Sequence, residues 1–130
     1  LVFGDPERLA LLNSLVHPAV IAREEEWMRE TESADPGGIA VVEAAILIET
    51  GSHRRFQKLV LAICTPEQQI ERAMKRDGLS REEVLHRLER QMPLEEKRKF
   101  TDYVIDTSGA KAATLEQVRR LYEELRRLTV

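Results

Sequence analysis

Arginine residues recur at helical spacing in the second half of the chain, and the spacing suits phosphate chemistry. Arg72 and Arg76 stand four positions apart, and Arg87 and Arg90 stand three apart, so each pair shares one helix face. A guanidinium group donates two parallel hydrogen bonds to phosphate oxygens and does not lose its charge. Phosphoryl transfer depends mainly on positioning and on such charges, so these residues indicate a kinase lid. The alternative is that they pair with acidic side chains on the surface, such as Glu83 with Arg87.

Short apolar segments flank this arginine-rich part of the chain and are predicted to be strands. Leu59–Cys64 leads into it, and Tyr103–Asp106 follows it. A third apolar run, Ile39–Leu47, lies upstream between glycines, as is typical of a strand buried on both faces. Strands that alternate with helices favour a parallel sheet in an α/β protein.

Capping residues and prolines predict where the helices begin and end. Asp5-Pro6 predicts the start of a first helix, and His17-Pro18 predicts its interruption, with a second helix from Pro18 to about Thr31. Thr65-Pro66 with Gln68 predicts a helix that Asp77-Gly78 ends. Three more helices are expected, beginning at Ser80, Pro93 and about Lys111.

The composition narrows the range of partners. The 130 residues include 20 Lys and Arg and 23 Asp and Glu, and this net charge of −3 gives no reason to expect nucleic-acid binding. No apolar run approaches the roughly 20 residues of a membrane helix. Cys64 is the single cysteine, which excludes an internal disulfide and fits a reducing compartment. We therefore expect a cytoplasmic protein without nucleic-acid or membrane partners.

The arginine-rich segment closely resembles the lid and final strand of dephospho-coenzyme A kinases. That family shows R-x-x-x-R-D-G-x-S, then R-x-x-x-Q-M-x-x-x-E-K, then D-x-V-I-D-N-x-G. The matching residues are Arg72, Arg76, Asp77, Gly78, Ser80, Arg87, Gln91, Met92, Glu96, Lys97, Asp102, Val104, Ile105, Asp106 and Gly109. Thr107 stands where the family usually has Asn. Further matches lie upstream at Val2-Phe3, Leu12-Asn13, His17-Pro18 and residues 42–51, with Ala45 and Ile48 replacing the usual Pro and Phe.

The resemblance implies a fold and an activity. The fold would be a partial P-loop NTPase-type parallel α/β sheet of three strands, with flanking helices and a helical lid. Residues 1–36 would form a helical acceptor-side segment, residues 37–71 and 101–130 a partial core, and residues 72–100 the lid. The activity would be transfer of the γ-phosphate of ATP, with Mg²⁺, to the 3′-hydroxyl of dephospho-coenzyme A, the last step of coenzyme A synthesis.

The resemblance also implies residue roles. Arg76, as the catalytic residue, and Arg72 would reach the ATP phosphates from the lid. The adenine side would be lined by Thr107, Ser108 and Gly109, and the acceptor side by His17, Leu47 and Glu49. Without the resemblance, His17 reads equally well as a helix-boundary residue and Glu49 as a helix cap.

One part of the family pattern is absent from these 130 residues. They contain no G-x-x-x-x-G-K-[ST] phosphate loop and no acidic general base following it, and we identify no metal ligands. We therefore expect an N-terminally truncated member that is inactive alone and can self-associate through exposed strand edges. The alternatives are another P-loop kinase for a small metabolite, such as a nucleoside monophosphate kinase, or a non-catalytic helical interaction remnant.

Overall fold

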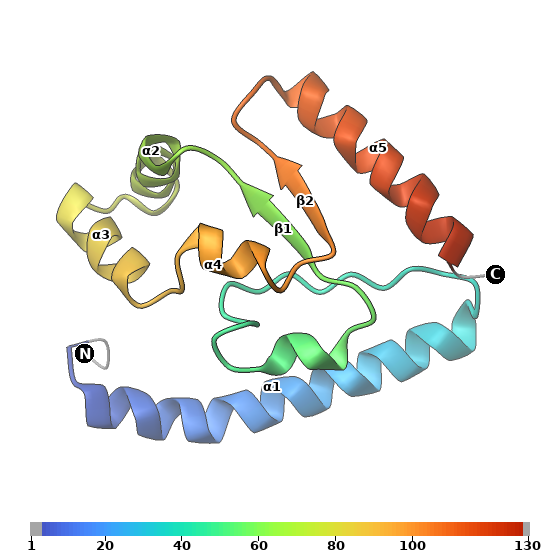
Figure 1. Ribbon diagram of the computed structural model, residues 1–130. Helices are drawn as coiled ribbons and strands as arrows, with labels where there is room; N and C mark the ends of the chain where they lie inside the picture. The colour runs from blue at the N-terminus through green and yellow to red at the C-terminus, as the bar shows by residue number, and fades with distance from the viewer. Residues whose placement is uncertain (1–3, 129–130) are drawn as a thin grey trace. The chain divides into compact units, whose positions relative to one another are not determined.

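The computed structural model describes residues 4–128, which fall into two compact units (Figure 1). One unit ends at Val41 and contains helix α1 (Pro6–Ala34). The other, Val42–Leu128, contains both strands of the described chain.

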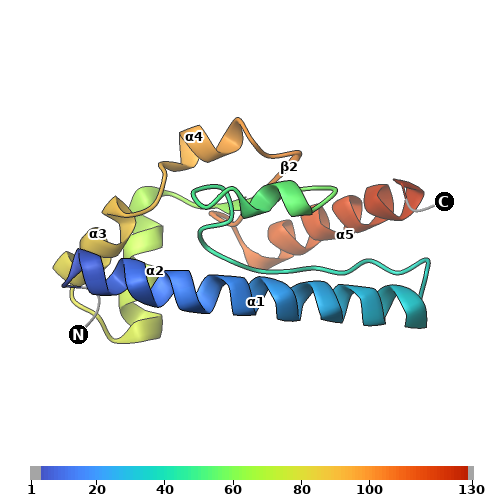
Figure 2. The ribbon, with the colours of Figure 1, turned by 90° about the horizontal axis from the view of Figure 1, so that it is seen from below.

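Helix α1 is continuous, which corrects the predicted interruption at His17-Pro18 (Figure 2). Asp5 caps its start, because the Asp5 carboxylate accepts hydrogen bonds from the backbone N–H groups of Glu7 and Arg8. Pro18 lies inside the helix, where it removes only one backbone hydrogen bond. The residues on both sides are mostly good helix formers, so the helix continues through it.

The sheet consists of two parallel strands, β1 (Val60–Ile63) and β2 (Tyr103–Asp106), which lie side by side in Figure 1. Val60 is opposite Tyr103, and Ile63 is opposite Asp106. Leu59, just before β1, joins the starts of the two strands. Its carbonyl accepts a hydrogen bond from the Tyr103 N–H at 3.2 Å, and its N–H donates to the Asp102 carboxylate at 2.7 Å. Both strands and their parallel arrangement were predicted from the sequence, with ends that agree within one residue.

The third predicted strand, Ile39–Leu47, is not a strand in the structure. Its first part has no regular structure, and its last residues belong to a turn in which the Thr50 N–H donates to the Ile46 carbonyl at 3.2 Å. A strand exists only where its backbone pairs with a neighbour, and the sheet order β1–β2 includes no partner for this segment. A short 3₁₀-helix, η1 (Ser52–Arg55), then leads toward β1.

The four remaining helices begin and end close to their predicted boundaries. Helix α2 spans Pro66–Asp77, α3 spans Arg81–Glu89, α4 spans Leu94–Arg98 and α5 spans Lys111–Leu128. Gly78 ends α2 in the left-handed conformation with φ 66°, which glycine adopts without steric cost. Ser80 caps α3 by accepting a hydrogen bond from the Glu83 N–H at 3.2 Å. The predicted local signals are therefore confirmed.

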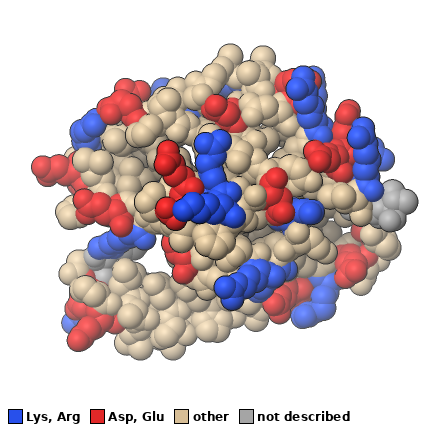
Figure 3. Space-filling model, viewed as in Figure 1, with Lys and Arg blue, Asp and Glu red and all other residues tan. Residues whose placement is uncertain are grey.

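The core of the second unit is small. Among the described residues, the buried apolar side chains are Ile70 from α2, Val84 from α3 and Ile105 from β2. Helix α2 packs against α3, α4 against β1, and α5 against β2. Acidic and basic side chains lie beside one another over the face shown in Figure 3. No helix between residues 4 and 128 is long and apolar enough to cross a membrane.

Candidate active site

A small polar loop follows β2, and its first residue continues the pairing with β1. The Thr107 N–H donates to the Ile63 carbonyl at 2.7 Å, and the Thr107 hydroxyl donates to the same carbonyl at 2.8 Å. Ser108 donates to the Asp106 carboxylate through its N–H at 2.8 Å and its hydroxyl at 2.6 Å. These bonds, led by that from the hydroxyl, hold the pKa of Asp106 below its usual range. We name residues 107–109 the nucleoside loop, after the adenine-side role that the resemblance predicts for them and that stays a prediction.

Helix α2 holds the nucleoside loop from the side. Arg72 donates to the Thr107 hydroxyl oxygen at 3.0 Å through Nη1 and to the Thr107 carbonyl at 2.9 Å through Nη2. One turn earlier, Gln68 Nε2 donates to the Ser108 carbonyl at 2.9 Å. The side-chain oxygen of Gln68 accepts from the Thr65 N–H at 3.1 Å and closes the predicted capping box, which fixes the orientation of the amide. The structure thus brings Arg72 together with the loop.

The next arginine along α2 has a different partner. Arg76 donates to both carboxylate oxygens of Asp77, with Nε–Oδ1 and Nη2–Oδ2 distances of 2.9 Å. Arg87 from α3 lies 3.6 Å from the same Oδ2 atom. The hydrogen bond from Arg76 lowers the pKa of Asp77, and the Asp77 carboxylate in turn raises the pKa of the Arg76 guanidinium. Two guanidinium groups therefore converge on one anionic oxygen, a geometry that also suits a phosphate oxygen.

The predicted acceptor-side residues fall in two places. Leu47 and Glu49 lie in the turn before η1, whereas His17 lies in α1, in the other unit. Glu49 Oε2 accepts from the Met92 N–H at 3.2 Å and lies 3.4 Å from Lys97 Nζ. Lys97 is buried and also donates to the Ala45 carbonyl at 3.1 Å. Glu49 thus connects this turn to the segment before α4 through non-covalent bonds. Its predicted contact with an acceptor stays a prediction.

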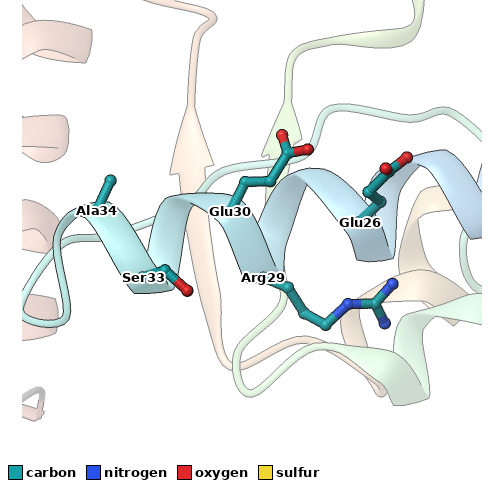
Figure 4. A pocket seen from close by; sticks show the side chains of 5 residues that line it. All are labelled: Glu26, Arg29, Glu30, Ser33 and Ala34. Atoms are coloured by element: carbon teal, nitrogen blue, oxygen red, sulfur yellow. The ribbon is translucent and has the colours of Figure 1, made fainter.

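A shallow depression on α1 is lined by residues from the last turns of that single helix, namely Glu26, Arg29, Glu30, Ser33 and Ala34 (Figure 4). Figure 4 shows Glu30 and Arg29 pointing to opposite sides of the helix. Since the charged groups do not converge, we assign no site there. Across residues 4–128, no group of three or more His, Cys, Asp or Glu side chains is placed to hold a metal ion.

Sequence reasoning missed two residues that organise these sites. Gln68 was recognised as a capping residue, but its bond to Ser108, 40 positions away, leaves no local signal. Lys97 stands in the motif that carried the resemblance, yet nothing in the sequence indicated that it is buried beside Glu49. A lysine is rarely buried unless it is paired. Because the sequence did not show that Lys97 is buried, it did not show the pairing with Glu49 either.

Two parallel strands flanked by helices, with a capped helix after β1 and a small polar loop after β2, define this chain as an α/β protein. The chain belongs to the dephospho-CoA kinase family, because the family model with that description matches residues 1–113. The resemblance found in the sequence is confirmed.

Individual relatives agree with this assignment. The chain is 40% identical over 121 residues to a dephospho-CoA kinase of Rhizobium meliloti and 39% identical over 127 residues to one of Aquifex aeolicus. It covers 62% and 63% of those two proteins, and they cover 93% and 98% of it. The chain therefore spans less than two thirds of the length of these relatives.

Two solved structures share the fold. The structure of TT1252 from Thermus thermophilus matches with a TM-score of 0.75 at 36% identity, over 95% of this chain and 63% of that one. The dephospho-CoA kinase from Campylobacter jejuni matches with a TM-score of 0.67 at 26% identity, over 99% of this chain and 63% of that one.

Proposed function

We propose that this chain supplies the nucleoside loop, the lid and part of the acceptor side of a kinase. The kinase transfers the γ-phosphoryl group of ATP to the 3′-hydroxyl of dephospho-CoA. Family membership supports the reaction. The observation that carries the assignment to this chain is the attachment of residues 107–109 to α2 through Arg72 and Gln68. This attachment places a polar backbone loop beside the helix that leads into an arginine-bearing lid.

Within this proposal Arg76 acts on the transferring phosphoryl group. Its guanidinium exchanges the Asp77 carboxylate for phosphate oxygens, whose paired geometry matches the same two donors. Negative charge on the phosphoryl oxygens is then stabilised by a fixed cation. Arg87 in α3 already lies close to the Asp77 carboxylate, so it is placed to contact the same phosphate oxygens.

The acceptor side rests on Leu47, Glu49 and His17. Lys97 holds Glu49 in place, so the turn that carries Leu47 and Glu49 has a defined position relative to α4. His17 lies in α1, in the other unit, and its acceptor-side role is proposed from the family pattern alone. A cytoplasmic location belongs to the same proposal, because the single cysteine, Cys64, fits a reducing compartment.

Magnesium is expected to accompany ATP, and no residues of this chain are assigned to it. The described residues include no cluster of metal-ligating side chains, and the 130 residues contain no phosphate loop with a hydroxyl ligand. When bound, the ion neutralises charge on the phosphates.

The test is a kinase assay on the purified product of the whole reading frame that encodes this chain. ADP formation must depend on dephospho-CoA, and mass spectrometry must find one added phosphate on the 3′-hydroxyl of that compound. Adenosine monophosphate and cytidine monophosphate serve as control acceptors and should give no turnover. Turnover with a nucleoside monophosphate but not with dephospho-CoA would refute the proposed function and favour a nucleoside monophosphate kinase.

A further inference from the structure

We propose that Arg72 is a positioning residue that fixes the nucleoside loop for base recognition and does not bind a phosphate group. This inference rests on the proposed function, because it assigns a role within the same nucleotide site. Both terminal nitrogens of Arg72 are directed at Thr107, at 3.0 Å to the hydroxyl oxygen and 2.9 Å to the carbonyl. A guanidinium held by two parallel bonds has a defined orientation.

The Thr107 hydroxyl both donates and accepts a hydrogen bond. It donates to the Ile63 carbonyl at 2.8 Å at the end of β1 and accepts from Arg72 Nη1. A hydroxyl group has one hydrogen to donate and lone pairs to accept, so the two bonds are compatible. The Thr107 hydroxyl therefore joins β1 to α2 through the first residue of the loop.

Gln68 adds a second attachment on the same helix face. Gln68 and Arg72 stand four residues apart, and their side chains hold the carbonyls of Ser108 and Thr107 respectively. Because both carbonyls accept from α2, the loop backbone has a fixed orientation on that side. A fixed backbone presents its remaining polar groups to a ligand at constant positions, which is what base discrimination requires.

The next position on this face explains why the two arginines differ. Arg76 lies one turn beyond Arg72, about 6 Å further along the helix axis. It does not reach the loop but pairs with Asp77, together with Arg87. A nucleoside triphosphate extends from base to phosphates in one direction. Along one face of α2, Arg72 would therefore lie at the base end and Arg76 at the phosphate end.

The experiment compares Arg72→Lys, Thr107→Val and a control, Lys75→Ala, in the product of the whole reading frame. Lysine retains the charge but donates from one nitrogen, and valine keeps the branched shape without the hydroxyl. Lys75 is an exposed cation on the same helix and has no role in the loop. Calorimetry measures the affinity for adenosine, which carries no phosphate, and steady-state kinetics compare ATP with GTP.

We expect Arg72→Lys to weaken adenosine binding about tenfold and to lower the preference for ATP over GTP by a similar factor, with kcat changed less than about threefold. Thr107→Val should weaken adenosine binding about threefold, and its effect should not add fully to that of Arg72→Lys. Lys75→Ala should behave like the wild type in both measurements.

Three results would overturn the inference. Unchanged adenosine affinity in Arg72→Lys, with kcat lowered equally for ATP and GTP, would make Arg72 a phosphate ligand. Equal losses in Lys75→Ala would show that the effect is not specific to Arg72 and its bonds to Thr107. If the wild type neither binds adenosine nor phosphorylates dephospho-CoA, the proposed function fails, and the role of Arg72 fails with it.

Discussion

Replacing Lys97 by methionine should destabilise the protein far more than the same change two residues later. The Lys97 side chain is 7% exposed, and its Nζ lies 3.1 Å from the Ala45 carbonyl and 3.4 Å from both Glu49 Oε2 and Gln91 Oε1. Methionine fills a similar volume but donates no hydrogen bond. The change therefore removes the donor and leaves the three acceptors in place.

The magnitude follows from what remains around Glu49. Its Oε1 atom is already buried without a hydrogen-bond partner, and without Lys97 the carboxylate keeps only the Met92 N–H at 3.2 Å. Removing one member of a buried ion pair costs about 3–5 kcal/mol. Glu49 is 18% exposed and can recover some hydration, so we expect about 3 kcal/mol. That is a large part of the roughly 5–15 kcal/mol that stabilises a typical domain.

The matched control is Lys99→Met. Lys99 also pairs with a glutamate, Glu96, at 3.2 Å, but the two side chains are 68% and 53% exposed. Such a pair contributes about 0.5 kcal/mol or less. Urea unfolding of the product of the whole reading frame, followed by circular dichroism, measures both variants.

A third variant tests the cause. Glu49→Gln in the Lys97→Met background removes the orphaned charge, so the double variant should be more stable than Lys97→Met alone, by about 1 kcal/mol or more. Equal losses for Lys97→Met and Lys99→Met, or strictly additive effects of the Glu49 and Lys97 changes, would refute the reasoning.

Four further predictions concern catalysis, association and pH. Arg76→Ala should lower turnover roughly a hundredfold while Arg81→Ala, whose exposed side chain pairs with Glu67, stays near the wild type; equal, small effects in steady-state assays would remove Arg76 from the reaction. The 130-residue chain alone should form no ADP with ATP and dephospho-CoA, because it lacks a phosphate loop, and dephospho-CoA-dependent ADP formation would contradict this. The same chain should associate through its strand edges, and a single monomeric species in sedimentation at high concentration would argue against it. The pKa of Asp106 is lowered in the folded protein, so Asp106 contributes stability that is present above about pH 4 and is lost as pH falls further. The thermal midpoint of Asp106→Asn should therefore depend less on acid pH than that of the wild type. Parallel pH profiles for the two proteins would exclude the Ser108 bonds as the cause.

Local chemistry predicted the helices well. Thr65, Gln68, Gly78 and Ser80 act on backbone groups within a few residues of themselves, so the sequence alone specifies their effect. Pro18 gave a wrong boundary, because a single lost hydrogen bond is outweighed by the helix-forming residues around it.

Contacts between residues far apart in the sequence were harder to predict. The apolar composition of residues 39–47 indicated a strand, but a strand also needs a neighbour, which composition does not reveal. The spacing of Arg72 and Arg76 placed them on one face, yet Arg72 bonds to Thr107, 35 positions away, whereas Arg76 pairs with its sequence neighbour Asp77. Spacing specifies the face of a helix, whereas the tertiary fold determines what lies opposite each side chain.

Within the proposed function, the convergence of Arg76 and Arg87 on Asp77 gives the lid a carboxylate that competes with phosphate. An anion that approaches these arginines meets a group with one net positive charge, since one carboxylate already offsets one of the two guanidinium groups. Its binding is therefore a substitution, in which the incoming oxygens replace those of Asp77. A single-atom anion such as chloride cannot replace a bond made through two oxygens, whereas a phosphoryl group can. Within the proposed function, a selectivity of the lid for phosphoryl groups would arise from the Asp77 carboxylate that occupies their place.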